Sequence, residues 1–148
     1  MADVHSKEIR RKNMSAIRAK DTAPELWLRY RLHALGFRYR LHVKDMPGIP
    51  DILMPKYKCV IFVHGCFWHR HQCHLFHWPS TRPEWWREKL GKNYYRDLVV
   101  QDKLRESGWR VLTVWECAIK GKNKIDEMLL IKEVSEWIIN GIPLKEIP

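Results

Sequence analysis

Apolar residues recur along the first third of the chain at the spacing of a helix. Leu28, Leu32 and Leu35 lie three to four positions apart, which places them on one face of a helix. The segment Thr22-Ala23-Pro24-Glu25 is a typical helix start, because threonine caps the first turn and the glutamate can return to cap it. Gly36 is typical of a helix end. We therefore expect a helix between these two signals.

Short apolar segments separated by turn residues follow, and they predict three strands. The first has room in residues 37–41, and the second begins at 51–54 after the rigid turn Pro47-Gly48-Ile49-Pro50. The third, residues 59–63, is an unbroken apolar run, which is typical of a central strand covered on both faces.

The second half of the chain returns to helical patterns around one further strand. Helical segments run from the start signal at 81–84 through Ser107, with an interruption expected near Gly91. A strand at 111–115 and a final helix over about 126–139 complete the series. This order predicts an α/β fold with a mixed sheet flanked by helices.

Composition limits the number of domains and the class of partner. A chain of 148 residues that is 45% apolar with eight tryptophans can bury one sizeable core, so residues 1–148 are expected to form a single domain. The net charge of +10 favours an anionic polymer, with nucleic acid first. No apolar run reaches the length of a membrane span, and the start Met-Ala-Asp-Val-His is unlike a signal peptide, so we expect a cytoplasmic protein.

The positive charge is concentrated near the N-terminus. Residues 1–44 hold 11 basic and four acidic side chains, a surplus of seven. Residues 1–20 are therefore expected to form a basic arm that contacts DNA phosphates and orders on its partner, although a solvated basic helix is the alternative. The candidate phosphate contacts are Arg10, Arg11, Lys12, Arg18 and Lys20.

A loop at 64–78 holds five of the eight histidines and two of the four cysteines. Cys66, His71 and Cys73 can supply three of the four nitrogen and sulfur ligands that zinc prefers, and Cys117, just after the next predicted strand, can supply the fourth. Such a site has no open position for water, so this zinc is expected to be structural, as a staple of the loop. Cys59 lies inside an apolar run and is expected to be a buried thiol.

Hydrolysis then requires a different metal, and Asp51 is the candidate ligand. A carboxylate at the mouth of a strand, directly after a rigid turn, suits magnesium, although such an aspartate is often only a turn residue. The order of elements is analogous to that of restriction endonucleases, which usually carry a glutamate and a lysine where this chain has Val63 and His64. Histidine can do comparable proton transfer near neutral pH, so His64 and His69 are the candidate catalytic bases and acids.

The chain resembles the very-short-patch-repair endonucleases of bacteria over nearly its whole length. The similarity runs from Lys12-Asn13-Met14 through Pro50-Asp51 and the block Cys59-Val-Ile-Phe-Val-His-Gly-Cys-Phe-Trp-His69 to Val114-Trp115-Glu116-Cys117. The central block is the most specific part of the resemblance.

The resemblance implies a division of roles among these residues. Zinc would be held by the four ligands named above, and magnesium by Asp51 with the backbone carbonyl of Val63, where the family often has threonine. His69, oriented by Glu25, would activate water, and His64 would assist the departing 3′ oxygen. The implied reaction is a magnesium-dependent nick 5′ to the thymine of a T:G mismatch produced by 5-methylcytosine deamination, which starts very short patch repair.

Aromatic residues in the zinc loop suggest how a mismatch is recognised. Phe67 and Trp68 are adjacent in a polar loop, where a wedge between base steps is a better interpretation than core packing. The resemblance adds Trp86, which could also be a core residue or exchange roles with Trp85, and Met14 from the basic arm.

The expected partners follow from the same resemblance. They are double-stranded DNA with a T:G mismatch, a DNA cytosine methyltransferase, a DNA polymerase and mismatch-repair proteins, with the chain itself a monomer at the nucleoid. Two alternatives use similar features. One is a zinc-stapled DNA-binding module without catalysis, which would not need Asp51, His64 and His69. The other is a zinc-dependent nucleobase deaminase, but its histidine-x-glutamate and Pro-Cys-x-x-Cys patterns do not occur in the sequence.

Overall fold

The computed structural model of the chain describes residues 20–148, and the elements within that range form a five-stranded mixed sheet with helices on both faces. The elements are α2 (Ala23–Ala34), β1 (Arg40–Leu41), β2 (Ile52–Met54), the 3-10 helix η1 (Pro55–Tyr57), β3 (Cys59–His64), α3 (Pro83–Glu106), β4 (Arg110–Trp115), α4 (Glu116–Ile119), α5 (Glu127–Asn140) and β5 (Leu144–Ile147). The mixed α/β fold expected from the sequence is confirmed.

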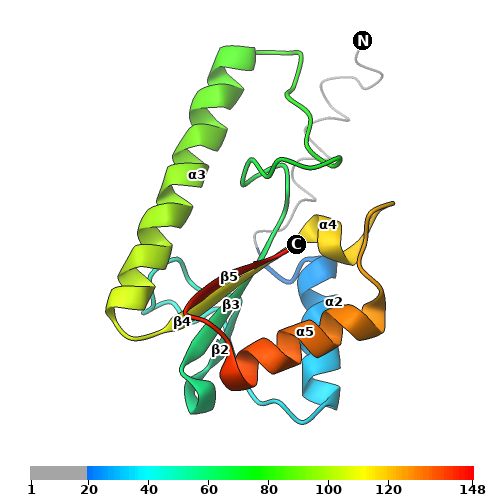
Figure 1. The fold of residues 1–148 in the computed structure, drawn as a ribbon. Coiled ribbons are helices and arrows are strands. Elements are labelled where there is room, and N and C mark those ends of the chain that lie inside the picture. Colours follow the sequence, from blue (N-terminus) through cyan, green and yellow to red (C-terminus); the bar gives the residue numbers. More distant parts are fainter. Residues whose placement is uncertain (1–19) are drawn as a thin grey trace.

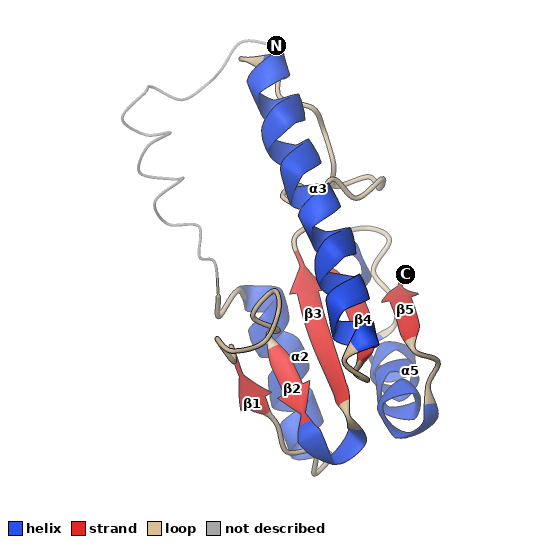
Figure 2. Ribbon diagram, turned by 90° about the vertical axis from the view of Figure 1, so that its left-hand side faces the viewer, coloured by secondary structure: helices blue, strands red, loops and turns tan. Residues whose placement is uncertain are grey.

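The strands lie in the order β1-β2-β3-β4-β5, and the sheet changes direction at its centre. β1, β2 and β3 are antiparallel neighbours, whereas β3, β4 and β5 run parallel. The long helix α3 crosses one face of the sheet and extends beyond it, while α2 and α5 cover the other face (Figures 1 and 2). β3 is central and buried, as its unbroken apolar sequence predicts.

Side chains of the strands point alternately to the two faces of the sheet, and each face carries its own apolar core. Strand residues such as Ile52, Ile61 and Val114 pack with the apolar residues of α2 and α5. Other strand residues, such as Phe62 and Val111, form a smaller cluster with Leu104 of α3. Because successive strand side chains point to opposite faces, both layers of helix are held by the same strands.

Helix α2 begins as its sequence predicts. The side chain of Thr22 accepts a hydrogen bond from the backbone N–H of Glu25 at 3.4 Å, and the Glu25 carboxylate accepts one from the backbone of Asp21 at 3.2 Å. Gly36, in the left-handed region at φ +96°, follows the end of the helix. The capping bonds fix the direction of the Glu25 side chain, which is buried.

The structure corrects several element predictions. α3 is one uninterrupted helix through Gly91, and Arg82, not Thr81, precedes it without a side-chain cap. Only Arg40–Leu41 of the expected first strand pairs with β2, because the preceding residues pack their rings against the α2–α5 core instead. The strand β5 and the short helix α4 were not expected.

The turn before Asp51 is packed tightly against α3. Gly48 has φ +73°, and a Cβ at this position would collide with the side chain of Val100 on α3 and press on Phe62 of β3. A glycine here therefore allows both the left-handed backbone and the close approach of the helix. This turn fixes the position from which β2 and Asp51 start.

Within residues 20–148, no helix combines the length and the apolar character that crossing a membrane requires.

Candidate active site and metal centre

The carboxyl ends of β3 and β4 bring the chemically interesting residues together. These strands are parallel neighbours, and His64 at the end of β3 pairs with Trp115 at the end of β4. The loop with most of the histidines follows His64, and α4 with Cys117 follows Trp115. Segments about 50 residues apart in sequence therefore meet at one edge of the sheet.

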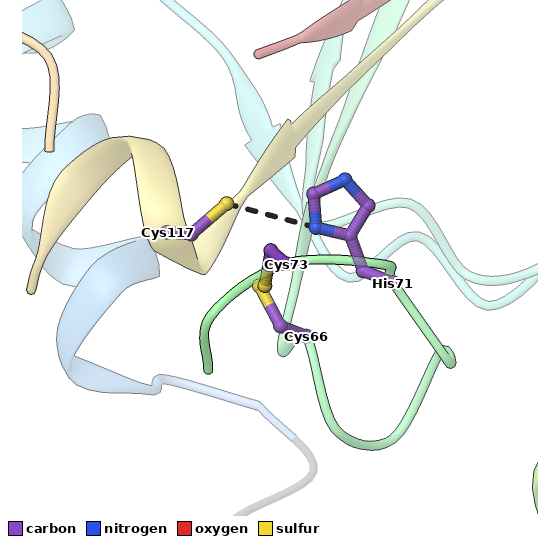
Figure 3. Close-up of side chains that lie close together, drawn as sticks. All are labelled: Cys66, His71, Cys73 and Cys117. Atoms are coloured by element: carbon purple, nitrogen blue, oxygen red, sulfur yellow. Dashed lines mark hydrogen bonds between the residues drawn. The ribbon is translucent and has the colours of Figure 1, made fainter. Parts of the chain in front are cut away.

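Four nitrogen and sulfur donors converge where the loop meets α4 (Figure 3). The donor atoms of Cys66, His71, Cys73 and Cys117 all lie within 4.8 Å of one another, and the Cys117 sulfur is 3.6 Å from Nδ1 of His71. Zinc bonds of 2.0–2.3 Å in a tetrahedron separate neighbouring ligands by roughly 3.3–3.8 Å. The donor types and their spacing therefore fit a zinc ion, and the structure brings together the set expected from the sequence.

Without a bound cation, burial disfavours the charged thiolate form of the cysteines in this cluster. Burial raises the pKa of both the Cys66 and Cys117 thiols. The neighbouring Cys73 raises both further, whereas a hydrogen bond with the Cys66 side chain lowers the pKa of Cys117. The pKa of His71 is lowered, chiefly by burial, which favours the neutral imidazole that metals bind. A bound cation would reverse the penalty on the thiolates.

His64 and His69 form a parallel stack next to this cluster. Their ring centroids are 3.7 Å apart with an interplanar angle of 1°. Burial, followed by the neighbouring His69, holds the pKa of His64 well below its usual value. Nδ1 of His64 is buried without a hydrogen-bond partner among the residues that the structure describes. The stack thus disfavours two positive charges at once.

His69 is held by a carboxylate that the sequence did not indicate. Its Nδ1 lies 2.6 Å from Oδ2 of Asp97, which projects from α3. The one available signal is helical spacing, because Asp97 follows buried Leu90 and Asn93 on the same face of α3 and is followed there by Leu104. A carboxylate on a buried stripe of a helix is unusual and could have drawn attention to it.

Asp51 lies beside the backbone at the end of β3. Its Oδ2 accepts a hydrogen bond of 2.8 Å from the backbone N–H of Val63, the residue before His64. Burial raises the pKa of Asp51 to about 7, and the Glu25 carboxylate adds to the rise, whereas the Val63 N–H opposes it. Among the described residues, the possible metal ligands within 4.8 Å of one another include His64 and His69 with Asp97, but this group does not contain the Asp51 carboxylate.

Glu25 belongs to the Asp51 side of the site and not to His69. Its carboxylate receives a 2.7 Å hydrogen bond from Arg29 and lies 3.0 Å from Nε2 of His42. His42 in turn is 3.8 Å from Asp51. The expectation that Glu25 orients His69 is therefore wrong for this structure, because the capping bonds of α2 and the Arg29 pair hold Glu25 elsewhere and Asp97 takes that place.

Three aromatic rings that were expected to form a wedge lie close together. Two belong to the loop after β3 and the third to the first turn of α3. Phe67 and Trp68 are 5.1 Å apart between ring centroids, and Trp86 lies 5.3 Å and 5.9 Å from them. All three are partly exposed. Trp85 contacts only Trp86 of this group and is more exposed, so Trp86 is the helix residue in the cluster. We call these three residues, Phe67, Trp68 and Trp86, the aromatic cluster.

Other expected DNA contacts fall largely outside the described range. Met14, Arg10, Arg11, Lys12 and Arg18 precede residue 20, whereas Lys20 is described and exposed. The core assignment of four tryptophans agrees with the structure, since Trp115 and Trp137 are buried and Trp27 and Trp109 pack against the two cores.

Two cavities adjoin the histidine pair. One of about 1030 Å³ is lined by residues that include Arg70, Tyr94 and Trp115, and the other, of about 420 Å³, lies against the turn at Gly48. Both are lined by His64, His69, Asp97 and Gln101. The histidine pair therefore borders both cavities.

Comparisons with known proteins show which family the chain is similar to. The family model described as DNA mismatch endonuclease Vsr matches residues 2–75. The chain is 50% identical over 138 residues to DNA mismatch endonuclease Vsr of Escherichia coli strain K12, covering 93% of this chain and 88% of that protein. It is 43% identical over 129 residues to the type II nicking enzyme V.XorIIP of Xanthomonas oryzae, covering 87% of this chain and 95% of that protein. It is also 40% identical over 140 residues to V.NmeAIP of Neisseria meningitidis, covering 93% and 100%.

The similarity to these nucleases identifies the chain as a DNA endonuclease, whose mixed α/β fold carries a cluster of cysteines and a histidine that could hold a metal ion. At these levels of identity and coverage, the chain belongs to the DNA mismatch endonuclease Vsr family. The resemblance inferred from the central block is confirmed.

Proposed function

We propose that this protein is a magnesium-dependent endonuclease that nicks DNA 5′ to the thymine of a T:G mismatch and so initiates very short patch repair. The observation that carries the proposal is the position of Asp51, the His64–His69 stack and the aromatic cluster near the end of β3 in a chain of the mismatch endonuclease family. A restriction-endonuclease-like sheet would serve as the scaffold. Mismatches of this kind arise by deamination of 5-methylcytosine.

Asp51 and the carbonyl of Val63 would hold the magnesium ion. The carboxylate is largely buried, with a pKa raised to about 7, so its charged form is poorly stabilised by the protein alone. Hard oxygen ligands and an unmet negative charge are what Mg²⁺ prefers. A divalent cation there would supply the positive charge that stabilises the phosphate oxygens during hydrolysis.

The side chains of this protein would move the protons. His69 would take a proton from the attacking water, and His64 would hold the departing 3′ oxygen through a ring N–H. Glu25 would act from the Asp51 side, where Arg29 and His42 keep its carboxylate in place. The attack is in line with the leaving oxygen, which places water and leaving group on opposite sides of the phosphorus.

Cys66, His71, Cys73 and Cys117 would hold a structural zinc. Since all four positions around the ion would be filled by protein, it would fix the loop and take no part in hydrolysis. His69 and the first two residues of the aromatic cluster lie on this same loop.

The aromatic cluster would enter the duplex at the mismatch, with Met14 from the other side. Unstacking a base step costs a few kcal/mol, and a mispair that is poorly stacked lowers this cost, which selects the damaged site. The basic arm, residues 1–20, would follow the phosphates as part of the single endonuclease domain of residues 1–148. The protein would act as a monomer in the cytoplasm at the nucleoid, after a cytosine methyltransferase has marked the site and before a polymerase fills it, with mismatch-repair proteins as further partners.

The wedge proposal predicts that Trp68→Ala weakens binding to a T:G duplex by about 10-fold or more, because stacking of one base on an aromatic ring contributes roughly 1–3 kcal/mol. Binding to the matched duplex should change less. Tyr95→Ala is the matched control, since Tyr95 is exposed on the face of α3 opposite Trp86. Equal losses on matched and mismatched duplexes would remove the wedge from recognition.

The proposed function is tested with labelled duplexes that carry each possible mispair in turn, incubated with magnesium or with chelator. We expect nicking of the thymine strand only, at T:G and only with the divalent ion. Binding of the T:G duplex without nicking under any metal condition would identify a DNA-binding module instead.

A further inference from the structure

A partly buried carboxylate on α3 pairs with His69 and with no other charged group in the described chain. Oδ2 of Asp97 is 2.6 Å from Nδ1 of His69, and the two side chains are 19% and 22% exposed. Among residues 20–148, no lysine or arginine nitrogen lies within 4.0 Å of this carboxylate. Asp97 therefore serves an imidazole that already stacks on His64.

This bond determines which nitrogen of His69 is free. A carboxylate accepts hydrogen bonds, so Nδ1 must carry the hydrogen that lies between the two groups. The lone pair of a neutral ring is then on Nε2, at the other end of the imidazole. Because a histidine ring can otherwise turn over and exchange its tautomer, a partner at Nδ1 fixes both orientation and tautomer.

Asp97 is not required to attach the loop to α3. Asn93, one turn earlier, donates a 3.0 Å hydrogen bond to the backbone carbonyl of Trp68 and is itself buried. On the other side of the loop, Nδ1 of His71 lies 3.6 Å from the Cys117 sulfur on α4. Two other contacts therefore hold the loop, and the Asp97 carboxylate is left with the histidine alone.

We propose that Asp97 is a positioning residue for nicking, which holds the His69 ring on His64 with Nε2 free to accept the proton of the attacking water. The proposal rests on the proposed function of His69. It assigns to a residue of α3 the orienting role that the family resemblance implied for Glu25.

The test compares Asp97→Asn with Asp97→Glu, His69→Ala and the control Asp102→Asn, in which an exposed carboxylate of the same helix is removed. Single-turnover nicking of a T:G duplex should fall by about 100-fold or more in Asp97→Asn, a typical effect of losing an oriented proton acceptor. Binding of the duplex and the thermal midpoint should be nearly unchanged. Asp97→Glu should recover part of the rate, and Asp102→Asn should retain all of it.

Nitrogen NMR of ring-labelled, zinc-loaded protein provides a readout that does not depend on nicking. The wild type should show His69 with hydrogen on Nδ1, and Asp97→Asn should lose this preference. A slow variant with an unchanged tautomer, or a wild-type rate in Asp97→Asn beside an inactive His69→Ala, would overturn the positioning role. If His69→Ala itself nicks at the wild-type rate, the failure belongs to the proposed function.

Discussion

Asp51→Asn is expected to lower the rate of T:G nicking by at least about 10³-fold, because a metal ion contributes several kcal/mol of charge stabilisation in phosphoryl hydrolysis. The asparagine oxygen can still accept the hydrogen bond from the Val63 N–H, so the end of β3 should keep its geometry. Zinc content and mismatch binding should therefore be retained. The measurement is single-turnover nicking at several magnesium concentrations, with binding followed separately.

The same substitution should stabilise the metal-free protein. The folded-state pKa of Asp51 is raised from 3.8 to about 7. A raised carboxyl pKa means that the wild type loses stability as the pH rises from about 4 through 7, since the buried group must ionise. Asp51→Asn avoids this loss, so in chelator its gain in unfolding free energy should be small near pH 4 and reach as much as about 4 kcal/mol above pH 7.

Asp45→Asn is the control, because it removes an exposed carboxylate from the preceding turn region. It should change neither nicking nor the pH profile of unfolding. Two results would count against the assignment of Asp51. One is nicking by Asp51→Asn at a rate close to the wild type, and the other is a stability difference that does not depend on pH.

Local sequence patterns predicted the elements that carry the site, but not all of the contacts within it. The apolar segments of β3 and β4 were recognisable from local sequence alone. Because the ends of neighbouring parallel strands share one edge of the sheet, Cys117 after β4 was expected to lie near Cys66 and Cys73 after β3, as the structure shows. β5 was missed because Leu144–Ile147 is a short edge strand that follows a proline and is only partly buried. Asp97 was missed because its pairing with His69 depends on how α3 crosses the sheet.

For Glu25, the family resemblance implied the role of orienting His69, whereas the structure pairs its carboxylate with Arg29 and His42. Its capping position was predicted correctly, and that position is what directs its carboxylate toward Arg29 and His42. A helix-capping signal is local, whereas the choice between Asp51 and His69 as a neighbour is decided by the packing of α2 against the sheet. Local rules could not distinguish the two.

The second large effect is expected from the cysteine cluster. Cys117→Ala should prevent binding of the proposed structural zinc, expected at one ion per chain, and lower the thermal midpoint by more than about 10 °C. The reason is that a structural zinc contributes a free energy comparable to the whole stability of a small protein. Cys117 lies on α4, so its loss frees the loop from the end of β4. Metal analysis and calorimetry measure the two effects.

Cys59→Ala is the matched control for the same change of side chain. Cys59 is fully buried in the α2–α5 core, where burial raises its pKa to about 11, and it lies outside the cluster of Cys66, His71, Cys73 and Cys117. This variant should keep its zinc and lose only about 1 kcal/mol of stability through a small cavity. A wild type that is well folded without zinc, or equal effects of the two substitutions, would contradict the structural role.

The two proposed metal sites should then separate in function as well as in position. Loss of zinc releases the loop that carries Phe67, Trp68 and His69, whereas the bond between Asp51 and Val63 belongs to β2 and β3 and does not depend on the loop. Cys117→Ala should therefore lose mismatch preference and nicking together, while Asp51→Asn loses nicking alone. Retained mismatch preference in zinc-free Cys117→Ala would mean that the aromatic cluster is held by its own packing and by the Asn93 bond to the Trp68 carbonyl.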